Sequence, residues 1–159
     1  MIRKTLEARQ VNRRELLALF GAGTVAAMGI SLAGPALADA KSTAAAIAKV
    51  TGGKSAAAGK ITLDTPQIAE NGSTVPISVS VDSPMTDADH VKKVHVWAEG
   101  NPNPDVASFH FTTMSGKAKV STRIRLAKTQ NIISVAEMSD GSFVMAKSEI
   151  KVTIGGCGG

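Results

Sequence analysis

Apolar and polar residues alternate from Lys60 to Ile154, and this two-residue period constrains the fold of the chain more than any other feature. The pattern is clearest in residues 118–126, where lysine, serine and arginine separate the apolar positions. Because successive side chains of a β-strand point to opposite faces, the alternation predicts strands with one buried face. The expected strands are residues 60–64, 75–81, 91–99, 108–113, 118–127, 132–138, 143–148 and 149–154.

Short segments rich in glycine, proline, asparagine and aspartate separate these strands. Such residues favour tight turns, and Asp140-Gly141 between two apolar runs is typical of a hairpin. Seven or eight short strands at this spacing predict an all-β fold, an immunoglobulin-like antiparallel β-sandwich over residues 60–154. A small barrel is the alternative. No disulfide can bridge the two sheets, because the chain has one cysteine.

Residues 39–59 are expected to form a short N-terminal helix and a linker. The alanine-rich stretch 43–50 favours a helix, and Gly52-Gly53 is a plausible helix end. The following residues, up to Gly59, are small or polar and predict a flexible link.

Three of the expected strands carry apolar residues on both faces. They are residues 91–99, where His95 and Trp97 share the second face, and residues 132–138 and 143–148. Strands of this kind are covered on both faces. Two coverings remain open from the sequence: the N-terminal helix or a long loop, or a stable protein partner on the outside of one sheet.

Residues 1–38 have the features of a cleaved export signal. A basic segment that includes Arg13-Arg14 precedes an almost wholly apolar run, and Ala36-Leu37-Ala38 offers a cleavage site before Asp39. The arginine pair resembles a twin-arginine signal, whereas a general secretory signal and an uncleaved membrane anchor are the alternatives. We therefore expect the mature protein to be exported.

Cleavage would leave 121 residues, enough for one domain. The signal contains five of the 18 lysines and arginines and two of the 13 acidic residues, so the mature chain has 13 basic and 11 acidic residues, a net charge of +2. No basic stripe interleaved with aromatic residues remains, which argues against nucleic-acid binding.

The chain ends in Gly155, Gly156, Cys157, Gly158 and Gly159, and this tail contains its only cysteine. A single cysteine cannot form a disulfide within its own chain. Because glycine has no side chain to pack, the four glycines predict a flexible tether, with a reach of about 17 Å when the five residues are extended. Such a tether suits a thiol that presents a covalent cargo to several enzymes. We expect Cys157 to be the attachment residue and the four glycines to be the tether.

The sequence predicts no catalytic residue in this chain. No lysine, arginine or histidine lies within five residues of Cys157, so nothing in the tail activates the thiol. The three histidines, His90, His95 and His110, belong to the β-rich body. His90 and His95 are expected on opposite faces, without a second thiol or a paired acid, so no metal site is predicted.

Other uses of the thiol remain open. The chain could be a non-catalytic exported binding module with an incidental thiol, or Cys157 could join two copies in a disulfide-linked homodimer. Activation of a C-terminal Gly-Gly as a thiocarboxylate, as in ubiquitin-like sulfur carriers, requires ATP and a different fold, so the export signal argues against it.

Five blocks of sequence resemble the SoxY family, the sulfur carriers of the bacterial thiosulfate-oxidising Sox system. They are residues 69–85, 101–112, 121–130 and 136–143, and the terminal VTIGGCGG. The resemblance implies an immunoglobulin-like sandwich, a periplasmic location and a heterodimer with SoxZ, a second small immunoglobulin-like protein. It also implies that cargo is held on Cys157.

The resemblance further implies partner enzymes that act on this cargo. A haem c enzyme couples thiosulfate oxidatively to the thiol, and a manganese-dependent hydrolase releases the terminal sulfonate as sulfate. In some organisms a molybdenum-haem dehydrogenase oxidises the remaining sulfane sulfur. The haem, manganese and molybdenum belong to those partners, so no cofactor is expected in this chain.

Overall fold

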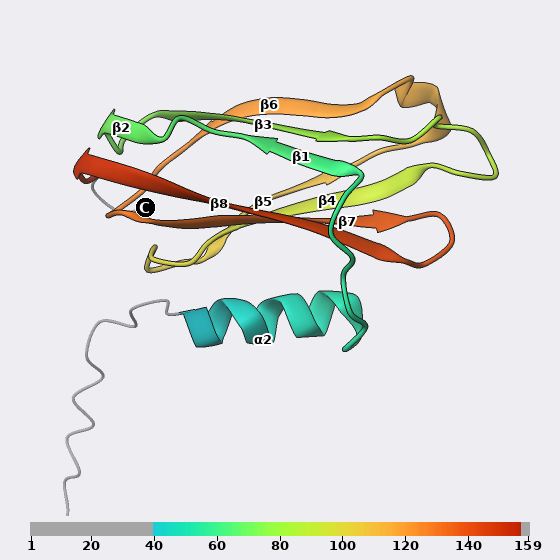
Figure 1. Cartoon of the computed structure of the whole chain (residues 1–159), viewed down its shortest axis with the longest axis horizontal. Helices are drawn as coiled ribbons and strands as arrows, with labels where there is room; N and C mark the ends of the chain where they lie inside the picture. Colours follow the sequence, from blue (N-terminus) through green and yellow to red (C-terminus); the bar gives the residue numbers. More distant parts are fainter. Residues whose placement is uncertain (1–39, 157–159) are drawn as a thin grey trace, which may run out of the picture. The chain divides into compact units, whose positions relative to one another are not determined.

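A computed structural model describes residues 40–156, which form one α-helix, eight strands and a short 3₁₀ turn (Figure 1). In chain order the elements are α2 (Ala40–Thr51), β1 (Ile61–Asp64), β2 (Ile68–Asn71), β3 (Val75–Val81), β4 (Val91–Ala98), β5 (Asp105–His110), η1 (Thr113–Ser115), β6 (Ala118–Ile124), β7 (Gln130–Met138) and β8 (Phe143–Ile154).

The strands form a sandwich of two sheets, as the sequence predicts. The smaller sheet has the order β1-β3-β6, and the larger has the order β2-β8-β7-β4-β5. Figure 1 shows the two sheets stacked face to face. Every neighbouring pair is antiparallel except β2 and β8, which run parallel.

The core lies between the two sheets and follows the two-residue period. In β3, Val75, Ile77, Val79 and Val81 are buried, and the residues between them are exposed or half-buried. These valines pack with inward-facing residues of the larger sheet, such as Ile150. Burial of apolar surface from both sheets therefore stabilises the sandwich without a disulfide.

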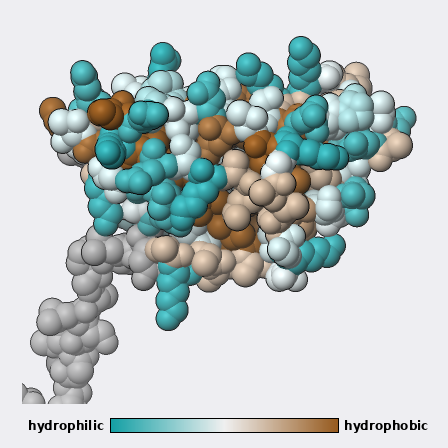
Figure 2. All heavy atoms as spheres, viewed as in Figure 1, coloured by the Kyte–Doolittle hydropathy of each residue, from teal (hydrophilic) through white to brown (hydrophobic). Residues whose placement is uncertain are grey.

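Helix α2 covers part of the outer face of the larger sheet. Four buried side chains of that face form a second apolar cluster, which packs against the helix and the residues just after it. They are Trp97, Ile133, Val135 and Phe143. Figure 2 shows apolar surface where α2 lies against the sheet. The sequence left open whether the N-terminal helix or a protein partner covers this face. The helix covers this cluster.

The helix ends where the two glycines predict, and it begins three residues earlier than expected. Gly52 and Gly53 both have positive φ, and the Gly53 amide donates to the Ala48 carbonyl at 2.9 Å. This six-to-one hydrogen bond is the one that closes a Schellman motif. The following segment is tied to the sheet rather than free, because Ala57 exchanges backbone hydrogen bonds with Phe143 and Met145 in β8.

Several strands differ from the sequence prediction. Strand β6 ends at Ile124 rather than at residue 127, and β7 begins at Gln130 rather than at residue 132. Residues 143–154 form one strand, β8, rather than the two that were expected. Strand β7 pairs with β8 from Phe143 to Ile150, and β2 pairs with β8 from Lys151 onward. Strand β2 was not expected; the chain crosses at Pro66 from one sheet to the other and then runs parallel to β8. Strand β5 begins and ends three residues earlier than expected, and the turn η1 follows it.

The expected export signal, residues 1–38, lies outside the described residues. Within residues 40–156, no helix has the length and apolar character needed to cross a membrane.

Candidate functional site

The candidate site is the point where the chain leaves β8. Strand β8 delivers Ile154 to the end of the larger sheet, beside β2 (Figure 1). Gly155 and Gly156 follow and are described, whereas Cys157, Gly158 and Gly159 lie outside the described residues.

Gly156 packs against the folded domain, and the tether role expected of Gly155, Gly156, Gly158 and Gly159 stays a prediction. Gly156 is buried, and its amide donates to the Leu126 carbonyl at 2.9 Å. The Gly72 amide donates to the Ile154 carbonyl at 2.7 Å, and the Leu126 amide donates to the Gly72 carbonyl at 2.8 Å. Glycine's lack of a side chain serves close backbone contact here rather than freedom of movement.

The loop that receives Gly156 is itself held by two buried amide side chains. Asn101 is 2% exposed and Gln130 is 6% exposed. The Asn101 side chain donates to the Arg125 carbonyl at 2.8 Å and accepts from the Ala127 amide at 3.0 Å. Because buried polar groups require partners, these contacts fix the backbone of the loop.

Gln130 completes this network. Its Nε2 group donates to Asn101 Oδ1 at 2.8 Å and to the Lys128 carbonyl at 3.0 Å, and its Oε1 accepts from the Gly100 amide at 2.6 Å. The loop between β4 and β5 and the first residue of β7 thus hold the β6–β7 loop, against which the tail packs.

Sequence reasoning missed Gly72, Asn101 and Gln130 as residues of the site. Gly72 follows Asn71, whose side chain accepts from the Ser73 amide at 2.8 Å, so its segment has the composition of an ordinary turn. Asn101 stands in a proline- and asparagine-rich segment that also predicts a turn. The available signal was that all three residues fall in blocks that resemble the SoxY family.

Two cations flank the receiving loop. Arg125 and Lys128 are exposed and stand on either side of Leu126 and Ala127, whose backbones contact Gly156 and Gly155. An exposed basic loop at this place favours a negatively charged group on the neighbouring tail.

The described histidines do not assemble a catalytic or metal-binding group. His90 Nδ1 lies 3.0 Å from the Thr86 carbonyl, and His95 Nδ1 lies 2.8 Å from the Ser108 hydroxyl. Burial, followed by the charge of Lys93, lowers the pKa of His95, which favours its neutral form. Within residues 40–156, no three histidine, cysteine or acidic side chains gather where they could hold a metal ion.

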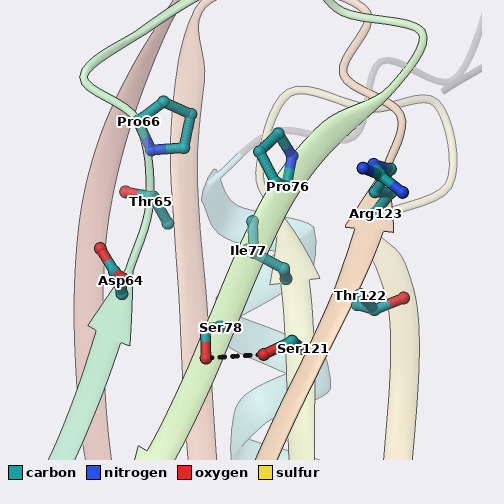
Figure 3. Close-up of a pocket in the computed structure, with 9 residues that line it drawn as sticks. All are labelled: Asp64, Thr65, Pro66, Pro76, Ile77, Ser78, Ser121, Thr122 and Arg123. Carbon is teal, nitrogen blue, oxygen red and sulfur yellow. Dashed lines mark hydrogen bonds between the residues drawn. The ribbon is translucent and has the colours of Figure 1, made fainter.

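A shallow hollow on the smaller sheet is a second place to consider (Figure 3). Asp64 and Arg123 lie on the two outer strands at opposite sides of it, and the Ser78 and Ser121 hydroxyls between them are hydrogen-bonded at 3.0 Å. Its described lining contains no nucleophile beside a base. The hollow therefore supports no catalytic assignment.

Comparison with known proteins identifies the family. The family described as "Sulfur oxidation protein SoxY" matches residues 47–157. A similar solved structure is the sulfur carrier protein SoxY from Chlorobium limicola f thiosulfatophilum, with 34% identity and a TM-score of 0.58. The match covers 73% of this chain and 100% of that chain. Comparison with curated proteins gave no match.

More distant structures share the fold alone. Superoxide reductase (neelaredoxin) from Ignicoccus hospitalis has 20% identity and a TM-score of 0.53, covering 59% of this chain and 80% of that chain. The hypothetical protein PH1083 from Pyrococcus horikoshii OT3 has 14% identity and a TM-score of 0.51, covering 65% and 98%. Because the family match covers residues 47–157 and the Chlorobium structure shares 34% identity over 73% of this chain, the chain belongs to the SoxY family of sulfur oxidation proteins.

Proposed function

We propose that this protein is a covalent carrier of sulfur intermediates in periplasmic thiosulfate oxidation, with Cys157 as the attachment residue. The observation that carries the proposal is the position of the only cysteine, in a glycine tail directly after a strand end that is anchored to the sandwich. Membership of the SoxY family supports it, as does the likeness to a solved sulfur carrier protein.

In the proposed chemistry, Cys157 holds the cargo and partner enzymes catalyse each step. Loading joins the Cys157 sulfur to the outer sulfur of thiosulfate: Cys–SH and S₂O₃²⁻ give Cys–S–S–SO₃⁻, one proton and two electrons, which the haem c partner accepts. A hydrolase partner then adds water across the S–S bond of the terminal sulfonate, which gives Cys–S–SH, sulfate and a proton. Both steps are proposed to belong to partner enzymes, because no lysine, arginine or histidine lies within five residues of Cys157 to activate the thiol.

A SoxZ-like protein is the proposed stable partner. Two large apolar side chains, Ile68 at 61% and Ile154 at 67% exposed, lie on the parallel strand pair at the sheet edge that leads into the tail. Exposed apolar side chains at a sheet edge favour a protein interface. We propose that this edge contributes to the heterodimer, next to the tail.

Mass spectrometry of Cys157, in protein purified from the periplasm of cells grown on thiosulfate, tests the proposal. We expect a mature chain that starts at Asp39, with adducts of about 32 Da for each sulfane sulfur or about 112 Da for the thiosulfonate. An unmodified thiol under these conditions would instead support an exported binding module with an incidental cysteine. A Cys157–Cys157 disulfide as the main species would support a homodimer.

The charge of the receiving loop is expected to affect loading. Changing both Arg125 and Lys128 to serine should lower the rate of enzymatic loading about three- to tenfold at low salt, because thiosulfate is an anion. The difference should shrink at about 0.5 M salt, where exposed charges are screened. Stopped-flow or quenched loading assays measure the rate. Lys119→Ser, on the opposite end of β6, is the matched control, and an equal loss in that variant would contradict the local effect.

A further inference from the structure

Close backbone contact at the tail leaves no room for a side chain at three glycines. A Cβ atom at Gly72 would lie 2.2 Å from the Leu126 carbonyl oxygen and 2.7 Å from the Gly156 nitrogen. A Cβ atom at Gly155 would lie 2.2 Å from the Ala127 carbonyl oxygen. At Gly156 it would lie 2.7 Å from the Gly72 carbonyl oxygen. Each of these opposing atoms belongs to the backbone and cannot rotate away.

None of the three needs glycine for its backbone angles. Positive φ is found at other described glycines, namely Gly52, Gly53, Gly59, Gly116 and Gly141. The requirement at Gly72, Gly155 and Gly156 is therefore the approach of three backbone segments, which the hydrogen bonds between Ile154, Gly72, Leu126 and Gly156 hold together.

We propose that Gly72, Gly155 and Gly156 form a backbone clamp, which fixes the point from which residue 157 leaves the sandwich. Gly72 is then a positioning residue for cargo transfer, an assignment that rests on the function proposed above. The carrier cysteine is the first residue after the clamp, rather than the middle of a five-residue tether.

The clamp limits where partner enzymes must meet the cargo. An extended residue adds roughly 3.3–3.6 Å of reach, so holding Gly155 and Gly156 removes about 7 Å from the possible travel of the sulfur. A shorter tether confines the sulfur to a smaller volume and raises its effective concentration at one place. That place is the end of the sandwich formed by the β2–β3 turn and the β6–β7 loop, which Asn101 and Gln130 hold rigid.

Amide hydrogen exchange measured by NMR tests the clamp without any sulfur cargo, so its failure is distinguishable from failure of the carrier function. In the wild-type protein, we expect the Gly156 amide to exchange at least about tenfold more slowly than in an unstructured peptide, because it is buried and hydrogen-bonded. In Gly72→Ala this protection should be lost, while amides of central strands such as β7 keep theirs. Ser73→Ala, in the same turn, adds no atom near Gly156 and should leave its exchange unchanged.

Two results would overturn the clamp. One is rapid exchange of the Gly156 amide in the wild-type protein, a measurement that stands even if Gly72→Ala fails to fold. The other is a folded Gly72→Ala variant in which Gly156 stays as protected as before.

A pair of thiol reactions separates positioning from a merely structural role. In Gly72→Ala, the reaction of Cys157 with a small disulfide reagent should stay within about twofold, because that reagent reaches the thiol from any direction. Loading by the partner enzyme should fall about tenfold in kcat/KM, because the sulfur no longer starts from a fixed point. Unchanged loading would show that Gly72 does not position the carrier residue.

Discussion

Replacing Cys157 with serine is expected to abolish cargo attachment while leaving the folded domain intact. A serine hydroxyl cannot form the sulfur–sulfur bond that holds a thiosulfonate or a sulfane. Within residues 40–156, the backbone hydrogen bonds that anchor the tail are made by Ile154 and Gly156, and they do not use the thiol. Intact-mass analysis should show no adduct in Cys157→Ser, and thiosulfate-dependent sulfate production should stop. The free energy of unfolding should change by no more than about 0.5 kcal/mol.

Gly159→Ser is the matched control, since it adds the same hydroxyl to the tail and keeps the thiol. It should retain the adducts seen in the wild-type protein. Sulfate production that continues in Cys157→Ser would contradict the carrier function. A loss of several degrees in Tm would mean instead that the thiol packs into the fold.

Replacing Asn101 with alanine is expected to be the most destabilising change near the site, by about 3 kcal/mol. The substitution removes the donor to the Arg125 carbonyl and the acceptor used by the Ala127 amide and by Gln130. The Arg125 carbonyl, the Ala127 amide and the Gln130 side chain would each lose a hydrogen-bond partner. The site is buried, since Asn101 is 2% exposed. In a domain of this size, we expect Tm to fall by about 10 °C.

Asn131→Ala provides the comparison for Asn101. Asn131 lies in β7, whereas Asn101 lies in the loop between β4 and β5. The Asn131 side chain donates one hydrogen bond, to Glu99 at 2.8 Å, and is only partly buried. Asn131→Ala should lower the free energy of unfolding by about 1 kcal/mol or less. Calorimetry or denaturant unfolding of both variants checks the difference. Equal, small losses would show that water replaces the Asn101 amide and that the loop is not held as described.

The Asn101 variant also connects stability with the site. Leu126, which receives the Gly156 amide, lies between the two residues that Asn101 holds. A more mobile β6–β7 loop should therefore also speed the hydrogen exchange of the Gly156 amide. The network that stabilises the domain and the contacts that position the tail are the same piece of structure.

The alternation of side chains was sufficient to predict the sandwich. Strands such as β3 were predicted residue for residue, because a strand with one buried face needs only a local two-residue period. The helix end at Gly52-Gly53 was equally local. The parallel strand β2 was not predictable in this way, because its four residues, Ile68–Asn71, have one buried position and no clear period.

The sequence by itself determined the all-β fold, the place of the single thiol and, through the resemblance, the family. Only the tertiary structure decided that α2 covers Trp97 and that Gly155 and Gly156 are held rather than free. The physical reason is that a glycine has two opposite uses: it allows freedom where nothing is near, and close approach where another backbone is. Which use applies depends on Gly72 and Leu126, which are distant in sequence and meet the tail only in the folded chain.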